Sequence, residues 1–169
     1  MCRTGSSSAA SAGDSAWRFE WIDGDVGIQL DQRLPPPSFG PYATSIEDDS
    51  FSGLAEAGLR MWRAPVVSLL ARNRFERIAG AAIEMDDHGS PGSPSIARAR
   101  ANQIVGNGAS VRVGGDHPLA SPSDFGTPAD PGGNLLACNA GGHALVQSVA
   151  GELRFAGNAW DHEIGRAHV

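Results

Sequence analysis

The chain has 169 residues, a net charge of −6 and 13 basic residues that are all arginine, and its length suits one domain with a buried core. The basic residues form no cluster, which excludes the electrostatic footprint of a protein that binds nucleic acid. No apolar stretch is long enough to span a membrane, and the distant pair Cys2 and Cys138 gives neither a disulfide framework nor a zinc site.

The first 16 residues are predicted to be a linker or a disordered segment, because Thr4 to Ser15 is rich in Ser, Ala and Gly and can bury little. Met1 to Ser15 also lacks the apolar core of a secretion signal, so we expect any export signal of the parent protein to be missing from this chain. The folded structure is expected to occupy residues 17–162.

An internal repeat of 24 residues is the main structural signal in the middle of the chain. Phe51 is followed by apolar residues three, eight and ten positions later, and Phe75 is followed by apolar residues at the same offsets. Alternation such as Ile83-Glu84-Met85 is typical of a strand with one buried face. Further copies follow in the second half of the chain, and a weaker copy starts at Phe19.

This repeat predicts a right-handed parallel β-helix, an all-β solenoid of about five or six coils that is incomplete at its ends. Equivalent residues of successive coils should then lie one above the other. The predicted interior stack comprises Phe51, Phe75, Ile104, Leu136 and Phe155. Corner amides that hydrogen-bond to their copies should form a ladder of Asn73, Asn102 and Asn134, with Asp49 at its margin, and a second series of Asn107, Asn139 and Asn158.

A mixed α/β fold is the alternative interpretation of the same region. Residues 52–62 and 66–83 can also be arranged as amphipathic helices, with Ser52 as an N-cap and Pro65 in a first turn. The core would then be lined by Leu54, Met61, Leu69 and Ile78. This alternative leaves the matched offsets and the asparagine positions without an explanation.

Candidate chemistry gathers where a predicted strand meets a variable loop. Two segments that break the repeat, His88 to Pro94 and Gly114 to Gly133, both follow such a strand. Asp86 and Asp87 are the candidate catalytic carboxylates, since glycoside hydrolysis needs one acid and one base, and a solvated turn is the alternative. Trp62 and Arg112 are candidate sugar-binding residues, for which packing and a solvated strand face are the alternatives.

The sequence predicts no cofactor and no metal site, with calcium as the one alternative. Glu47, Asp48 and Asp49 offer the oxygen ligands that calcium prefers, although such a triplet is also typical of an exposed bend. His117 and His143 are isolated in the sequence and form no ligand pattern.

Several motifs in the second half of the chain resemble the closing coils of bacterial pectate-lyase-like β-helix proteins, in a family of unknown function. These motifs are Ile104-Val-Gly-Asn107-Gly, Gly132-Gly-Asn134, Cys138-Asn139 and Gly157-Asn-Ala-Trp160-Asp161. The resemblance implies a secreted or cell-surface protein without an assigned activity. It does not extend to the Gly-His-Gly and Arg-x-Lys motifs of polygalacturonase-like enzymes, which this chain lacks.

The last seven residues, 163–169, resemble a translated sequencing adapter, and we expect them to be a non-native tail on a fragment. The expected function is therefore that of an extracellular or cell-surface β-helix module that binds polysaccharide or mediates adhesion. A partial or degenerate polysaccharide-degrading enzyme, either a glycoside hydrolase or a lyase, is the alternative. The sequence does not determine the oligomeric state.

Overall fold

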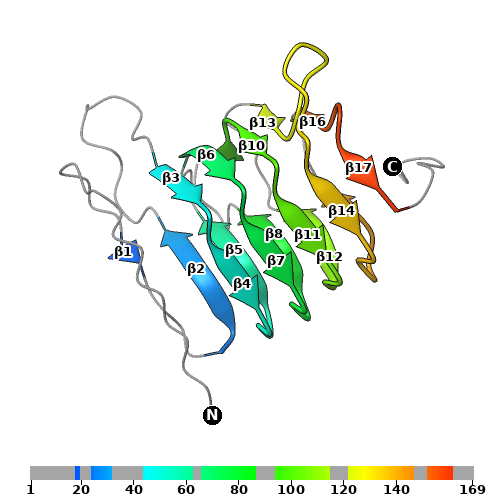
Figure 1. Cartoon of the computed structure of the whole chain (residues 1–169). Coiled ribbons are helices and arrows are strands. Elements are labelled where there is room, and N and C mark those ends of the chain that lie inside the picture. The colour runs from blue at the N-terminus through cyan, green and yellow to red at the C-terminus, as the bar shows by residue number, and fades with distance from the viewer. Residues whose placement is uncertain are drawn as a thin grey trace.

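The computed structural model describes residues 18–19, 24–31, 44–62, 66–86, 94–114, 122–146 and 152–161, and all regular structure in these ranges is β-strand (Figure 1). The all-β prediction is confirmed. The alternative of helices over residues 52–62 and 66–83 is wrong, because both ranges consist of short strands joined by tight corners. The predicted linker and the predicted non-native tail lie outside the described residues.

The strands form four sheets, which we name A to D. Sheet A contains β1 (Arg18–Phe19), β2 (Val26–Asp31), β5 (Ala57–Trp62), β8 (Ala81–Asp86), β12 (Ala109–Val113) and β15 (Ala144–Val146). Sheet B contains β3 (Thr44–Glu47), β6 (Val66–Ala71), β9 (Ser95–Ile96) and β10 (Ala99–Arg100). Sheet C contains β4 (Ser50–Ser52), β7 (Arg74–Glu76), β11 (Gln103–Val105), β14 (Leu135–Ala137) and β17 (Ala159–Trp160), and sheet D contains β13 (Ser123–Asp124) and β16 (Leu153–Arg154).

All pairings in these sheets are parallel except the one between β1 and β2, which is antiparallel. The chain visits the sheets in a fixed order. It passes from B to C to A with β3, β4 and β5, and again with β6, β7 and β8. A third passage uses β9 to β12, and in the fourth β13 of sheet D precedes β14 and β15. The first two passages therefore add one strand each to sheets B, C and A, the third adds two short strands to sheet B and one each to C and A, and the fourth adds one strand each to D, C and A (Figure 1).

The spacing between equivalent residues follows the lengths of the connections. Successive rungs of sheet C are 24, 29, 32 and 24 residues apart. β8 ends at Asp86 and β9 begins at Ser95. The repeat-breaking segment His88 to Pro94 lies between these strands, and all of it except Pro94 lies outside the described residues. The segment Gly114 to Gly133, which breaks the repeat, contains strand β13 and, after it, an irregular loop that precedes β14. Residues 115–121 of this segment lie outside the described residues.

One line of apolar side chains runs through sheet C. Phe51, Phe75, Ile104 and Leu136 are register partners from rung to rung, and the rings of Phe51 and Phe75 stack with centroids 4.6 Å apart. The line ends on Trp160, which pairs with Leu136. The prediction that Phe155 occupies this position is wrong. Phe155 lies before the corner and instead stacks on the buried ring of Phe125 at 4.7 Å.

The side chains of Asn73, Asn102, Asn134 and Asn158 form a hydrogen-bonded ladder at the corner before sheet C. In each step the Oδ1 atom of one asparagine accepts hydrogen bonds from the backbone N–H and the side-chain amide of the asparagine below, at 2.8 to 3.1 Å. Asn158 therefore belongs to this ladder and not to the second series, where it was expected. The reason is its position two residues before Trp160, which matches the position of Asn134 before Leu136.

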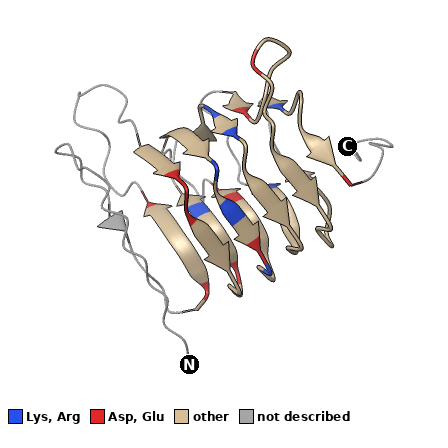
Figure 2. Cartoon of the chain, in the orientation of Figure 1, with Lys and Arg blue, Asp and Glu red and all other residues tan. Residues whose placement is uncertain are grey.

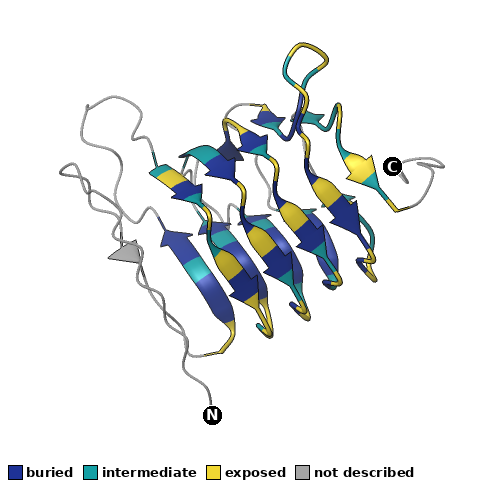
Figure 3. Ribbon diagram, in the orientation of Figure 1, coloured by how far each residue is buried: buried dark blue, intermediate teal, exposed yellow. Residues whose placement is uncertain are grey.

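The second ladder consists of Asn107 and Asn139 at the opposite corner of sheet C. The Oδ1 atom of Asn139 accepts from the backbone N–H and the side-chain amide of Asn107 at 3.0 and 3.1 Å. In the rung below, Ile78 takes the equivalent place and donates its backbone N–H to Asn107 Oδ1 at 3.1 Å. Buried polar groups need such partners, so both ladders help to fix the register of the stack. Figure 3 shows buried and exposed segments recurring at the same height on successive strands of sheet C.

Candidate functional site

The strongest candidate site lies on the outer face of sheet A, where its parallel strands end. Parallel strands end at the same edge of a sheet: Trp62 and Asp86, the last residues of β5 and β8, are register partners, and Val113, the last residue of β12, pairs with Met85. Leu59, Ile83 and Val111 point into the core, and the alternation of strand residues turns their neighbours outward. Three of the sequence candidates, Trp62, Asp86 and Arg112, therefore share this face.

Trp62 and Asp86 are direct register partners on β5 and β8. The Arg60 guanidinium lies over the Trp62 indole, with its central carbon 5.4 Å from the ring centroid. This distance is within the range of a cation–π contact, which restricts the motion of the indole. Trp62 and Asp86 are both half-buried, so each presents part of its side chain to solvent.

The same face carries a line of charged side chains of alternating sign, Glu56, Arg60, Glu84 and Arg112. Arg60 pairs with Glu56 at 2.7 Å and with Glu84 at 2.6 Å, and Arg112 pairs with Glu84 at 3.3 Å. Burial lowers the pKa of Arg60, but the hydrogen bonds to Glu84 and Glu56 outweigh this effect and raise the pKa overall. Arg60 therefore stays protonated and is no proton acceptor for a lyase reaction.

Gly114 gives this face an open position beside Asp86. It directly follows β12, and a Cβ atom placed on it would lie 3.7 Å from the nearer Asp86 carboxylate oxygen, at ordinary contact distance. The candidate Asp87 and the neighbouring His88 lie outside the described residues. The described structure thus brings Glu84 and Asp86 to this face together with Glu56.

The outer face of sheet A is buried at strand β2. Gln29 and Asp31 occupy the positions equivalent to Arg60 and Trp62, and each is only 5% exposed. The accessible part of the face therefore begins at β5 and continues over β8 and β12. Figure 2 shows basic and acidic residues next to one another on the central strands.

The acidic triplet Glu47, Asp48 and Asp49 lies at the corner between β3 and β4. The Arg72 guanidinium contacts Glu47 at 2.8 Å and Asp48 at 2.7 Å. Hydrogen bonds from Ser45 and Arg72 hold the pKa of Glu47 below its usual value, and the Arg72 hydrogen bond does the same for Asp48. Two of the three candidate calcium ligands therefore bind an arginine. Within the described ranges no three His, Cys, Asp or Glu side chains form a group that could hold a metal ion.

His143 lies beside the end of the described structure, and His117 lies outside the described residues. The Asp161 carboxylate contacts His143 Nε2 at 3.1 Å and accepts a hydrogen bond from the backbone N–H of Cys138. The His143 ring meets Trp160 edge-on at 5.1 Å. These contacts fasten β17 to the preceding corner. The Cys138 thiol is exposed and forms no disulfide.

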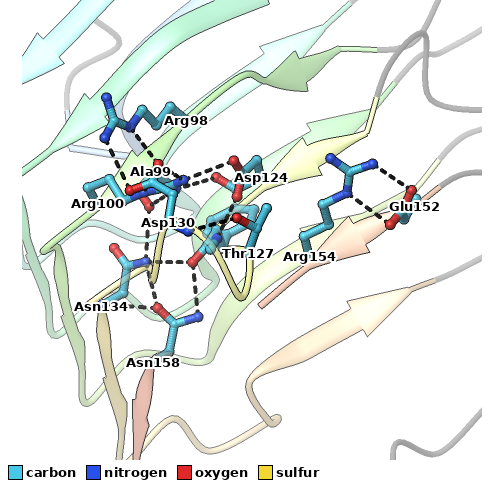
Figure 4. A network of polar contacts seen from close by, with 12 residues as sticks. Arg98, Ala99, Arg100, Asp124, Thr127, Asp130, Asn134, Glu152, Arg154 and Asn158 are labelled. Carbon is cyan, nitrogen blue, oxygen red and sulfur yellow. Dashed lines mark hydrogen bonds and ion pairs between the residues drawn. The ribbon is translucent and has the colours of Figure 1, made fainter. Parts of the chain in front are cut away.

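A second polar network, which sequence reasoning did not detect, surrounds Arg100 (Figure 4). Arg100 is only 11% exposed and donates to Asp124 at 2.9 Å and to Asp130 at 2.7 Å, while Arg98 contacts the same Asp130 at 3.1 Å. Asp130 also donates its backbone N–H to the Thr127 hydroxyl at 3.0 Å. The network ties the loop between β13 and β14 to sheet B.

A shallow groove of about 480 Å³ lies beside this loop. Its walls are the loop residues Gly126, Thr127 and Pro128 and the segment 152–156 of β16 and its flanks. The Arg154 and Glu152 side chains at its rim pair with each other at 2.9 Å. This mutual pairing leaves the groove without a charged group directed at a ligand, so the outer face of sheet A remains the stronger candidate.

The described part of the chain contains no helix that is long and apolar enough to cross a membrane. No protein-family model matches the chain, and neither the curated proteins nor the solved structures contain a significant match.

Proposed function

We propose that the chain forms a right-handed parallel β-helix of an extracellular or cell-surface protein and binds polysaccharide on the outer face of sheet A. The repeated passage through the sheets, the parallel register and the corner asparagine ladders support the β-helix. Right-handedness is expected because connections between parallel strands of one sheet are right-handed in nearly all proteins. The surface location rests on the resemblance of the motifs in the second half of the chain.

The register pair of Trp62 and Asp86, with Arg112 on the next strand, is the observation that carries the binding function. An indole face packs against the C–H groups of a sugar ring, while carboxylate and guanidinium groups hydrogen-bond to its hydroxyls. An open sheet face across several strands suits an extended polymer better than a small ligand, which binds in an enclosed pocket. Adhesion through surface glycans would use the same contacts.

Affinity gel electrophoresis tests this function. The chain is run through native gels that contain xylan, β-glucan, galactomannan, alginate or polygalacturonate, and retardation is compared with a gel without polymer. We expect retardation in at least one gel, and an affinity about tenfold lower for Trp62→Ala and for Arg112→Ala, in the range of a strong contact residue. Arg74→Ala is the matched control, because Arg74 is an exposed strand arginine on sheet C that pairs with Glu76. Absence of retardation in every gel, or equal retardation of Trp62→Ala, would contradict the proposal.

Polysaccharide hydrolysis is the second candidate function, and one feature favours it. Glu84 and Asp86 lie two residues apart on the same face of β8, a backbone separation of about 7 Å. Inverting glycosidases separate their carboxyl groups by about 6.5 to 9.5 Å. Both oxygens of Glu84 contact arginines, however, which keeps Glu84 ionised and unsuited to the role of the acid. A reducing-end assay on the same polymers tests this function. Release of reducing ends by the wild type and its loss in Asp86→Asn would show that the chain hydrolyses polysaccharide.

A further inference from the structure

The two arginines of the sheet A face are held very differently by Glu84. Arg60 Nε lies 2.6 Å from Glu84 Oε2, whereas the nearest Arg112 nitrogen lies 3.3 Å from Glu84 Oε1. The first distance is that of a strong charge-assisted hydrogen bond, and the second exceeds the usual range. Arg60 is 13% exposed and Arg112 is 39% exposed. Arg112 is therefore the loosely held and accessible member of the pair.

Arg60 has further contacts that fix it in place. It also pairs with Glu56 at 2.7 Å and lies against the Trp62 indole. A guanidinium can form several hydrogen bonds in fixed directions, so Arg60 can hold Glu56, Glu84 and the indole together without moving. Arg112 has one carboxylate contact in the described structure, the long one to Glu84.

We propose that Arg60 is a positioning residue that makes Arg112 available to oxygen atoms of the bound polysaccharide. Arg60 satisfies the charge of Glu84, and this carboxylate therefore attracts Arg112 only weakly. Without Arg60, Glu84 is a partly buried carboxylate with one remaining cation nearby, and it draws the Arg112 guanidinium onto itself. The inference rests on the proposed function, because it assigns Arg112 to ligand contact.

The chemical reactivity of Arg112 tests the inference without any ligand. Phenylglyoxal modifies accessible, unpaired guanidinium groups, and peptide mass mapping reports the modification of each arginine in the intact chain. We expect Arg60→Gln to lower the reactivity of Arg112 by about threefold, the effect of one partly exposed ion pair. The double variant Arg60→Gln with Glu84→Gln should restore the reactivity, because the Glu84 carboxylate then no longer draws Arg112 onto itself.

Arg74 on sheet C is the internal reference, since general unfolding would raise its reactivity together with that of Arg112. If Arg60 only stabilised the fold, Glu84→Gln would remove a further ion pair from the charged line and would not restore the reactivity of Arg112. Recovery in the double variant therefore indicates a positioning role. Equal Arg112 reactivity in the wild type and Arg60→Gln, or a double variant without recovery, would overturn the inference.

A binding measurement tests both proposals together. It uses the polymer, among xylan, β-glucan, galactomannan, alginate and polygalacturonate, that retards the wild type most strongly. Arg60→Gln should weaken retardation about threefold, and the double variant should regain most of it. If Trp62→Ala and Arg112→Ala bind as the wild type does, the proposed function fails whatever the reactivity of Arg112. If both lose binding while Arg60→Gln keeps it, the function stands and the positioning role fails.

Discussion

The Oδ1 atom of Asn102 accepts two hydrogen bonds from Asn73, one from its backbone N–H at 3.0 Å and one from its side-chain amide at 3.1 Å. The Asn102 amide in turn donates to the Leu70 carbonyl oxygen at 2.8 Å and to Asn134 Oδ1 at 2.9 Å. One buried side chain thus connects three successive rungs.

Asn102→Ala should lower the free energy of unfolding by about 3 kcal/mol, because it leaves buried donors and acceptors without partners. Gln103→Ala is the neighbouring control, since Gln103 is exposed, and its effect should stay within about 0.5 kcal/mol. Urea denaturation followed by circular dichroism measures both. Similar unfolding midpoints for the two variants would show that the ladder contributes little to stability.

Ala101 has a left-handed backbone with φ of 55°, in the same corner position as Asp48 and Arg72, whose φ values are 60° and 57°. A residue with a Cβ atom is strained there and glycine is not. Ala101→Gly should therefore raise the free energy of unfolding by about 0.5 to 1 kcal/mol.

The matched control is Ala99→Gly, because Ala99 is fully buried on strand β10 and has no positive φ. This substitution should lower the free energy of unfolding by about 1 kcal/mol. Thermal melts of the two variants should shift in opposite directions, and a shift in the same direction would argue against the strain at residue 101.

Gly58 on β5 has no room for a side chain. A Cβ atom at this position would lie 2.6 Å from the Phe75 ring and 2.7 Å from the Ala82 carbonyl oxygen. Gly58→Ala should cost about 2 kcal/mol, a typical penalty for overpacking a core. Gly114→Ala, which meets only the Asp86 carboxylate at ordinary contact distance, should leave the unfolding midpoint nearly unchanged. Equal effects would contradict the different packing around the two glycines.

The Arg100 hydrogen bond to Asp130 holds the pKa of Asp130 below its usual value, with a smaller contribution from Arg98. A carboxyl group with a lowered pKa in the folded state stabilises the fold above its unfolded pKa, and this stabilisation is lost as the pH falls through the folded value. Arg100→Met should therefore destabilise the chain more at pH 7 than at pH 2.5. Urea titrations at the two pH values measure the difference, and an equal loss at both would exclude this ion pair as a source of acid sensitivity.

The sequence was sufficient to predict the repeat in the regions where its spacing is regular. The 24-residue offset from Phe51 to Phe75 appears as direct register pairing, and Asn73, Asn102 and Asn134 follow the same corner. These positions can be predicted from the sequence because the interior of the stack requires an apolar side chain, and the buried corner requires a side chain that hydrogen-bonds to the rungs above and below.

The last rung was assigned incorrectly because two aromatic residues fit its pattern. Phe155 precedes Asn158 by three residues, as Ile104 precedes Asn107, whereas Trp160 follows Asn158 by two, as Leu136 follows Asn134. The hydrogen bonds of Asn158 to Asn134 decide between them in favour of Trp160. An asparagine marks either corner, so its spacing alone does not identify which corner it occupies.

The charged contacts were the least predictable part of the candidate site. Trp62, Asp86 and Arg112 could be chosen from their residue types, but the pairing of Arg60 with Glu84 could not be predicted. Their pairing depends on the register between β5 and β8, which only the three-dimensional structure supplies. The Arg100 network depends on an irregular loop outside the repeat, and periodicity carries no information about such a loop.

The equivalence of the two left-handed corners at Asp48 and Arg72 makes the length of this protein adjustable. The 24 residues that follow Asp48, residues 49–72, begin and end at the same point of the backbone path. If the gene encoded this unit twice, β11 would still pair with Arg74 and Phe75 of β7, as it does now. The stack can thus be lengthened in whole 24-residue units, and the outer face of sheet A would lengthen with it.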